Sequence, residues 1–189
     1  MYVLLILASV LSDDDEAALA AAIKAGDRTA FRKFFDRYHA ELLRYLRHRK
    51  VPEDVAEDLV QNAFVHIWEQ RGSIREGGSL RGLLFRIGYT RALNHFRDTA
   101  RFSAEDPSEL GLSAEAQADP AERSEVRAAL QAAVEALPER RRAVFELCVL
   151  EGMTYREAAE ALEISTKTVE NHMGYALKAV RERLEAFRS

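Results

Sequence analysis

The stretch from Thr154 to Tyr175 reads T-Y-R-E-A-A-E-A-L-E-I-S-T-K-T-V-E-N-H-M-G-Y and predicts two short helices joined by a tight turn. Thr154 followed three residues later by Glu157 is a capping box, in which the two side chains satisfy free backbone N–H groups at the start of the first helix. The turn is expected at Glu163-Ile164, with Ile164 between the two helices, and Ser165 is expected to cap the second helix. This pattern is typical of a helix-turn-helix.

The second of these helices has an apolar face and a polar face. The apolar residues recur at steps of three and four and are expected to face the core; they are Val169, Met173, Ala176, Leu177 and Val180. The residues left on the other side can hydrogen-bond to base edges or phosphates; they are Thr166, Lys167, Glu170, Asn171 and His172. A merely solvated face is usually built from Glu/Lys pairs at four-residue spacing, and this one is not, which favours DNA binding.

The composition favours helix nearly throughout the chain. Of the 189 residues 48% are hydrophobic, only nine are Gly and four are Pro, and no run of alternating β-branched residues indicates a strand. This length allows one domain or two small ones. We therefore expect an all-α protein.

The sequence offers no pattern for catalysis or metal binding. Cys148 is the single cysteine, so the chain cannot form an internal disulfide, and its place on the apolar side of a helix favours a core position. The five His residues lack ligand spacing, and neither a Gly-rich phosphate loop nor a nucleophile elbow occurs. We expect no enzyme activity, no metal, no cofactor and no small-molecule substrate.

Charge is distributed unevenly, although the net charge is −4. One acidic run lies at positions 13–16, and another lies in a Ser-, Ala- and Pro-containing segment at 102–123, whose low apolar content predicts a flexible linker. Basic residues gather at 86–101 and at 140–142. Because the local field decides where a phosphate backbone binds, an acidic chain can still bind DNA.

The first twelve residues, M-Y-V-L-L-I-L-A-S-V-L-S, are mostly apolar. They lack the basic leader of a signal peptide and are too short to span a bilayer. We expect residues 1–12 to be a disordered or wrongly assigned start, and a membrane-associated tail is the alternative.

Four helices are expected before the linker. They run from 13 to 25, ended by Gly26; from Asp27, as cap, to 50; from Pro52 to 70; and from 80 to 101, after a polar loop at 72–79. The second helix has an apolar face of Phe31, Phe34, Phe35, Tyr38, Leu42, Leu43 and Leu46. A block of packed helices is therefore predicted at 13–101.

The last two of these helices carry contrasting polar faces. The helix at 52–70 has an acidic strip of Glu53, Asp54, Glu57, Asp58 and Gln61, which is either simply solvated or a dock for a basic protein surface. The helix at 80–101 is expected to bury Leu83, Leu84, Ile87, Leu93 and Phe96. Its outward residues suit single-stranded nucleic acid, because rings stack on bases and cations neutralise the backbone, although an ordinary basic face is the other interpretation.

Four sequence blocks in this order resemble the sigma-70 superfamily, and above all its extracytoplasmic-function (ECF) group of alternative sigma factors. The blocks are A-F-R-K-F-F-D-R-Y, V-A-E-D-L-V-Q-N-A-F-V-H-I-W, L-F-R-I-G-Y-T-R-A-L-N-H-F-R and L-P-E-R-R-R-A-V-F-E-L followed by G-M-T-Y-R-E-A-A-E-A-L. The resemblance implies sigma region 2 at 13–101, a linker at 102–123 and the helix-turn-helix of sigma region 4 at 124–189. It also implies a cytoplasmic protein.

The resemblance further implies a partner for each polar face. In the family the helix bearing E-D-L-V-Q binds the clamp of the largest RNA polymerase subunit, which here implies Asp54, Glu57, Asp58, Leu59, Gln61 and Asn62. The next loop and helix capture unpaired bases of the minus-ten promoter element, which implies the loop at 72–79 with Arg86, Tyr89, Arg91, Asn94, His95 and Arg97. The helix-turn-helix reads the minus-thirty-five element, which implies Ser165, Thr166, Lys167, Thr168, Glu170, Asn171 and His172. The polymerase flap and an anti-sigma factor are the further partners that the resemblance implies.

The chain departs from the family pattern at several positions. Many relatives have Gln-Glu where this chain has Gln61-Asn62, Trp in place of Leu83, Asn in place of Thr90 and Arg in place of Glu170. A carboxylate at position 170 can accept from a cytosine amino group or repel a phosphate, so the promoter sequence stays open.

Two other classes fit part of the sequence. A two-domain response regulator would share the recognition helix T-V-E-N-H-M, but it would need β-α alternation and a phospho-accepting Asp pocket before it. A membrane-tethered helical interaction protein would use residues 1–11 as its anchor and the acidic strip as its dock.

Overall fold

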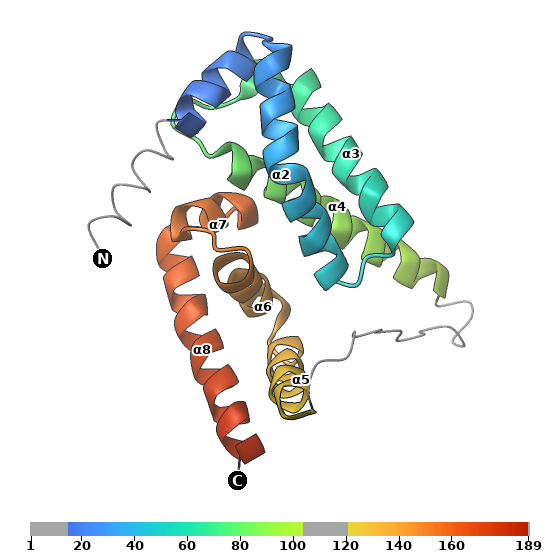
Figure 1. Ribbon diagram of the computed structural model, residues 1–189, viewed down its shortest axis with the longest axis vertical. Helices are drawn as coiled ribbons and strands as arrows, with labels where there is room; N and C mark the ends of the chain where they lie inside the picture. Colours follow the sequence, from blue (N-terminus) through green and yellow to red (C-terminus); the bar gives the residue numbers. More distant parts are fainter. Residues whose placement is uncertain (1–14, 104–120, 189) are drawn as a thin grey trace. The chain divides into compact units, whose positions relative to one another are not determined.

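The computed structural model describes residues 15–103 and 121–188, and most of these residues are helical (Figure 1). Within these two ranges no residue lies in a β-strand. The chain divides into two compact units after His95, which lies within a long helix. The predicted all-α fold is confirmed, and the β-α alternation of a response regulator is not found in the described part of the chain.

Unit 1 contains three helices, a short 3-10 turn and the larger part of a fourth helix, which continues beyond His95. Residues 15–24 are helical, and they are followed by α2 (Arg28–His48), α3 (Glu53–Glu69), the turn η1 (Arg71–Ser73) and α4 (Leu80–Ser103). Gly26 has φ +90°, a conformation that L side chains rarely adopt, and it ends the first helix as predicted. Asp27 caps α2, since its Oδ1 accepts hydrogen bonds from Thr29 N at 2.7 Å and Ala30 N at 3.1 Å.

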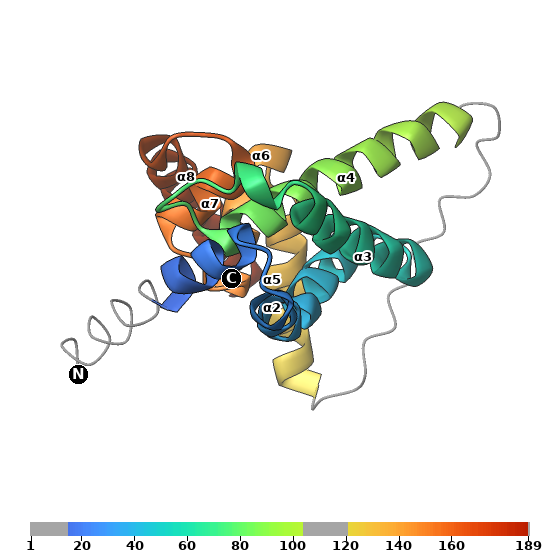
Figure 2. The ribbon, with the colours of Figure 1, turned by 90° about the horizontal axis from the view of Figure 1, so that it is seen from above.

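The core of unit 1 joins α2 to its two neighbours. Helices α2 and α3 lie side by side in both views (Figures 1 and 2), and the buried rings of Phe34 and Phe64 meet edge-on with centroids 5.2 Å apart. On α4, a Cβ added at Gly88 would lie only 2.6 Å from Leu42 Cδ1 of α2. The lack of a side chain at Gly88 therefore sets how closely α2 and α4 approach.

Unit 2 is built around its last helix. It contains α5 (Ala121–Glu135), α6 (Glu139–Phe145) with a following π-helical turn η2 (Glu146–Leu150), α7 (Tyr155–Leu162) and α8 (Thr166–Arg188). Helix α8 packs against α5, α6 and α7. The predicted capping box is present, because Thr154 Oγ1 accepts from Glu157 N at 3.2 Å while Glu157 Oε2 accepts from Thr154 N at 2.7 Å.

The turn of the helix-turn-helix also forms where it was predicted. Glu163 has φ +54° and ends α7 in the left-handed conformation. Ser165 then caps α8, since its Oγ accepts from Thr168 N at 3.0 Å.

Two predicted core positions are wrong. Leu93 is 37% exposed, and α4 instead buries Leu84, Phe85 and Ala92, the positions that flank its close approach to α2 at Gly88. Leu177 is 48% exposed, because α8 is buried along the row that contains Ala176. The other predicted core residues of α8 are buried as expected, namely Val169, Met173, Ala176 and Val180, so only one edge of its apolar face was misassigned.

None of the described helices is both long enough and apolar enough to cross a membrane. The apolar residues 1–12 and most of the expected linker lie outside the described residues, and so do the predictions made for them.

Candidate protein and nucleic-acid surfaces

Helix α3 presents its acidic strip to solvent. The buried face of the helix contains Ala56, Val60, Ala63, Phe64 and Ile67. The predicted residues lie on the other side: Asp54, Glu57, Asp58, Gln61 and Asn62 are exposed, and Leu59 is half-buried at the border. The structure therefore brings the six predicted residues together on one surface, which we call the α3 surface.

The charge of the α3 surface is largely uncompensated. Glu53, at the start of the helix, forms an ion pair with Arg47 of α2. Within the described ranges, Asp54, Glu57 and Asp58 have no cation within ion-pair distance. These three carboxylates form a negative patch that a basic protein surface would complement, which is a basis for specificity and fast association.

The residues predicted on helix α4 differ in their exposure to solvent. Asn94 and Arg97 are exposed, whereas Arg86, Arg91 and His95 are half-buried. Arg97 lies 3.8 Å from the adjacent Asp98, and both side chains are more than half exposed, so this pair holds Arg97 only weakly. The exposed side chains are free to reorient toward a ligand, and the half-buried ones have more fixed positions.

Tyr89 of α4 is held by a residue that the sequence analysis did not single out. The guanidinium carbon of Arg49 lies 5.3 Å from the Tyr89 ring centre and 5.8 Å from that of Tyr45. Arg49 is only 9% exposed, and it directly follows the end of α2. A guanidinium favours the electron-rich face of an aromatic ring, so Arg49 fixes Tyr89 against α2. A cation 40 positions away in the chain gives no local signal of this contact.

The loop before α4 is anchored at both ends. At its start the Arg71 guanidinium lies 4.7 Å from the Trp68 ring centre and donates to Trp68 O at 2.8 Å. Within the loop Ile74 is buried. At its end Ser79 is 5% exposed and caps α4, because its Oγ accepts from Gly82 N at 3.0 Å. The polar loop predicted at 72–79 therefore has fixed ends.

Helix α8 exposes most of the predicted recognition residues at its start. Thr166, Lys167, Glu170 and Asn171 are exposed, and Thr168 and His172 are half-buried. Lys167 Nζ lies 2.8 Å from Glu170 Oε2. Glu170, which stands where many relatives have Arg, therefore has a counter-ion in this structure. Ser165 and Thr168 share a hydrogen bond of 2.7 Å between their hydroxyls, which occupies them in the cap.

The polar face of α8 continues into a residue that sequence reasoning missed. Tyr175, four residues after Asn171, is 58% exposed, and the guanidinium of Arg141 from α6 lies 4.7 Å from its ring centre. The four-residue spacing from Asn171 was the available signal. Arg141 belongs to the basic run at 140–142, so the stacking brings one predicted cation next to the recognition face.

The described residues offer little for covalent or metal chemistry. Burial, and secondarily the negative charge of Glu157, raises the pKa of Cys148 to about 11. The thiol is therefore protonated at neutral pH, whereas the thiolate is the reactive form. Cys148 is half-buried rather than fully in the core. No group of three or more potential metal ligands occurs in the part of the chain that the structure describes.

Comparison with known proteins places both units in one family. The family model "Sigma-70 region 2" matches residues 34–102, which include most of α2 and all of α3, and "Sigma-70, region 4" matches residues 127–180, which include the helix-turn-helix. RNA polymerase sigma factor CnrH of Cupriavidus metallidurans is 31% identical over 188 residues, covering 92% of this chain and 96% of CnrH. ECF RNA polymerase sigma factor SigK of Mycobacterium ulcerans is 26% identical over 182 residues, covering 92% and 95%.

Solved structures share the fold. The structure of CnrH in complex with the cytosolic domain of CnrY superposes with a TM-score of 0.66 at 26% identity, covering 90% of this chain and 97% of that one. The sigma factor RpoE in complex with the anti-sigma factor NepR from Bartonella quintana gives a TM-score of 0.65 at 21% identity, covering 82% and 96%.

Proposed function

Since the chain belongs to the sigma-70 family and is an alternative sigma factor of the ECF type that directs transcription initiation, we propose that its three exposed polar surfaces divide this task between them. The observation that carries the proposal is that each of these surfaces lies on a different helix. The acidic surface lies on α3, the basic and aromatic one on α4, and the hydrogen-bonding one on α8. Binding to polymerase, to melted DNA and to duplex DNA needs three surfaces of these chemical kinds.

The α3 surface binds the core polymerase at the clamp of its largest subunit. Its exposed Asp54, Glu57 and Asp58 have no ion pair within the described residues. A basic partner can therefore form ion pairs with these carboxylates without displacing an internal cation. Gln61 and Asn62 add neutral donors and acceptors beside them, and Leu59 adds apolar contact at the border. Charge complementarity of this kind gives specificity and a high association rate.

The loop at 72–79 and the α4 surface bind the unpaired strand of the minus-ten element. Asn94 and Arg97 are exposed for contacts to base edges and phosphates, and Arg86, Arg91 and His95 lie beside them. Tyr89 is held by Arg49, so its ring is positioned before a base arrives, which lowers the entropy lost on binding. Capturing a base outside the stack offsets an unstacking cost of a few kcal/mol and so stabilises melted promoter.

The first turns of α8 read the minus-thirty-five element in the major groove. Thr166, Lys167, Glu170 and Asn171 are the exposed candidates, with His172 at the border, and the Arg141–Tyr175 pair extends the surface along the helix. An Asn side chain can pair with adenine, a Lys with guanine or phosphate, and a Glu with the cytosine amino group. The domain limits that we propose are 13–101 for region 2, 102–123 for the linker and 124–189 for region 4.

A regulatory protein is the third kind of partner that we propose. The similarity to CnrH, whose solved structure contains the cytosolic domain of CnrY, supports a protein that holds this chain away from polymerase. We assign this partner to the anti-sigma class, and we assign the polymerase flap to region 4.

Run-off transcription tests the proposed function. Purified core polymerase, with and without this chain, is given a library of promoters that vary in the minus-ten and minus-thirty-five elements. We expect discrete transcripts only when the chain is present, from templates that share two sequence elements at a fixed spacing. Duplex DNA binding by the chain alone, with no effect on transcription by core polymerase, would overturn the proposal in favour of a conventional regulator.

A further inference from the structure

The first helix, residues 15–24, contacts the loop before α4 at two points. Near its start Glu16 Oε1 accepts hydrogen bonds from Ser79 Oγ at 2.9 Å and from Arg81 N at 3.0 Å. At its other end Lys24 Nζ lies 3.8 Å from Glu76 Oε1. The residues joined by these contacts are more than 50 positions apart in the sequence, so the helix lies along the loop from its middle to its end.

The Glu16 contact is the firmer of the two. Ser79 is buried, and its hydroxyl donates to Glu16 while accepting from Gly82 N at 3.0 Å, so the carboxylate fixes the group that caps α4. The Lys24–Glu76 pair is more exposed, with 39% and 95% of its side chains accessible, and such a pair contributes little.

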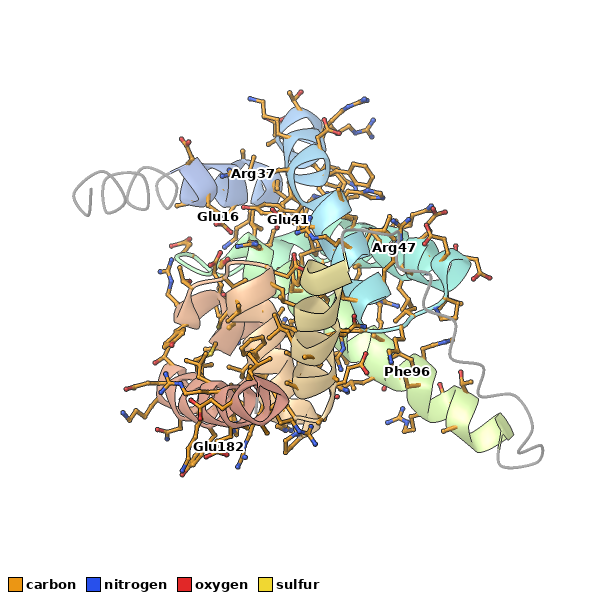
Figure 3. The ribbon with its side chains drawn as sticks, turned by 60° about the horizontal axis from the view of Figure 1, so that its bottom comes forward. Glu16, Arg37, Glu41, Arg47, Phe96 and Glu182 are labelled. Atoms are coloured by element: carbon orange, nitrogen blue, oxygen red, sulfur yellow. The ribbon has the colours of Figure 1, made fainter. Side chains whose placement is uncertain are left out.

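A second carboxylate supports the same corner. Arg81 Nε and Nη2 both lie 3.0 Å from Glu41 Oε2 of α2, and the Arg81 side chain is only 13% exposed. Glu16 and Glu41 lie on adjacent elements of unit 1 (Figure 3). Arg81 is thereby held by its backbone from the first helix and by its side chain from α2, which fixes the first turn of α4.

The negative charge of Glu16 affects the buried Tyr38 of α2. Burial raises the pKa of Tyr38 to about 12, and the negative charge of Glu16 is the next largest cause. The Glu16 carboxylate therefore lies close enough to the Tyr38 hydroxyl to disfavour its ionisation.

The helix has its own anchor, independent of Glu16. Ile23 is fully buried and Ala20 is 7% exposed, so an apolar face holds residues 15–24 in place. Removing the Glu16 carboxylate should therefore release the end of the loop without detaching the helix.

We propose that Glu16 is a positioning residue for the minus-ten loop, and that the first helix is a strap that holds this loop in the form that receives an unpaired base. This inference rests on the proposed function of the loop at 72–79. Glu16 touches no DNA; it acts through Ser79 and Arg81 by reducing the conformational freedom that the loop would lose on binding.

The test uses holoenzyme and a fluorescent fork-junction probe with a single-stranded minus-ten element, together with a series of probes that are abasic at each position in turn. The variants are Glu16→Ala and Glu16→Gln, and Asp15→Asn is the matched control, because Asp15 is an exposed carboxylate next to Glu16. For the wild type we expect one abasic position to weaken binding strongly, and for Asp15→Asn the same.

For Glu16→Ala we expect affinity for the intact probe to fall roughly tenfold, and the abasic penalty to shrink by the same factor, because the lost hydrogen bonds are charge-assisted. Glu16→Gln keeps an acceptor oxygen and should lie between Glu16→Ala and the wild type, and it carries the test if Glu16→Ala does not fold. Unchanged binding of the intact probe by both variants would overturn the inference, and so would equal weakening on intact and abasic probes, which indicates a general structural effect.

The proposed function fails separately. If the wild type itself shows no abasic penalty at any position, the loop does not capture a base, and the positioning role falls with it.

Discussion

Replacing Gly88 with Ala tests how α2 and α4 are packed in unit 1. Helix propensity alone predicts that this change stabilises the protein by up to about 1 kcal/mol, because Gly is a poor residue in the middle of a helix. The structure predicts the opposite sign. The new Cβ would lie 2.6 Å from Leu42 Cδ1 and 3.2 Å from Cδ2, so the fully buried Leu42 side chain has to shift within the core.

The expected loss follows from this overlap. Forcing one extra methyl group into a packed core typically destabilises by about 1–3 kcal/mol. For a unit of this size that loss lowers the melting temperature by roughly 5–20 °C. Because α4 carries the surface that we propose for the minus-ten element, binding of melted promoter should weaken in parallel.

The chain provides a specific probe for this measurement. Trp68 is the single tryptophan, it lies on α3 of unit 1, and its ring packs 4.9 Å from that of Phe31. Urea unfolding followed by its fluorescence therefore reports unit 1. A matched control is Gly174→Ala on α8, where a new Cβ meets nothing within 4 Å, and which should stabilise unit 2 by about 0.5–1 kcal/mol as seen by circular dichroism.

A double-mutant cycle makes the test stricter. Leu42→Ala alone should cost about 2–5 kcal/mol, but in Gly88→Ala it also removes the overlap, so the two losses should sum to more than the loss in the double variant. Two results would refute the packing argument. One is a urea midpoint for Gly88→Ala equal to or above that of the wild type, and the other is a loss of unfolding free energy in the double variant equal to the sum of the two single losses.

Three further predictions concern the other parts of the chain. Thr154→Ala removes one half of the capping box and should destabilise unit 2 by about 0.5–2 kcal/mol while weakening duplex binding, which denaturation and fluorescence anisotropy measure. Asp58→Lys should reduce affinity for core polymerase by roughly tenfold or more at low salt, whereas Asp36→Lys, an exposed reversal on α2, should not; equal effects in a pull-down titration would contradict a core-binding α3 surface. Tyr38 has its pKa raised to about 12 in the folded state, so its contribution to stability is complete below pH 10 and is lost as the pH rises toward 12. Tyr38→Phe should therefore lose less stability than the wild type between about pH 10 and about pH 12, as read from urea midpoints.

Local signals in the sequence predicted the helix ends well. Asp27, Gly26 and the Thr154–Glu157 box each act within four residues of themselves, so a single sequence contains the whole interaction. The exposed polar residues of α3 and of the start of α8 were likewise predicted, because an acidic or polar strip at helical spacing has to face solvent.

The parts that could not be predicted depend on contacts between distant segments. Arg49 and Tyr89 are 40 positions apart, and Glu16 and Ser79 are 63 apart, so no periodicity indicates that they meet. Leu93 was misplaced for a related reason, since the rotation of α4 is decided by where Gly88 meets α2. The roles of the site residues on DNA and polymerase stay predictions until the experiments above are done.

The ion pair between Lys167 and Glu170 has a consequence for how the chain responds to ionic strength. Lys167 and Glu170 carry opposite charges side by side, so together they bring no net charge to the start of α8. In the proposed complex of α8 with the major groove, fewer counterions are then released, so the slope of log affinity against log salt should be shallower than the number of basic side chains suggests.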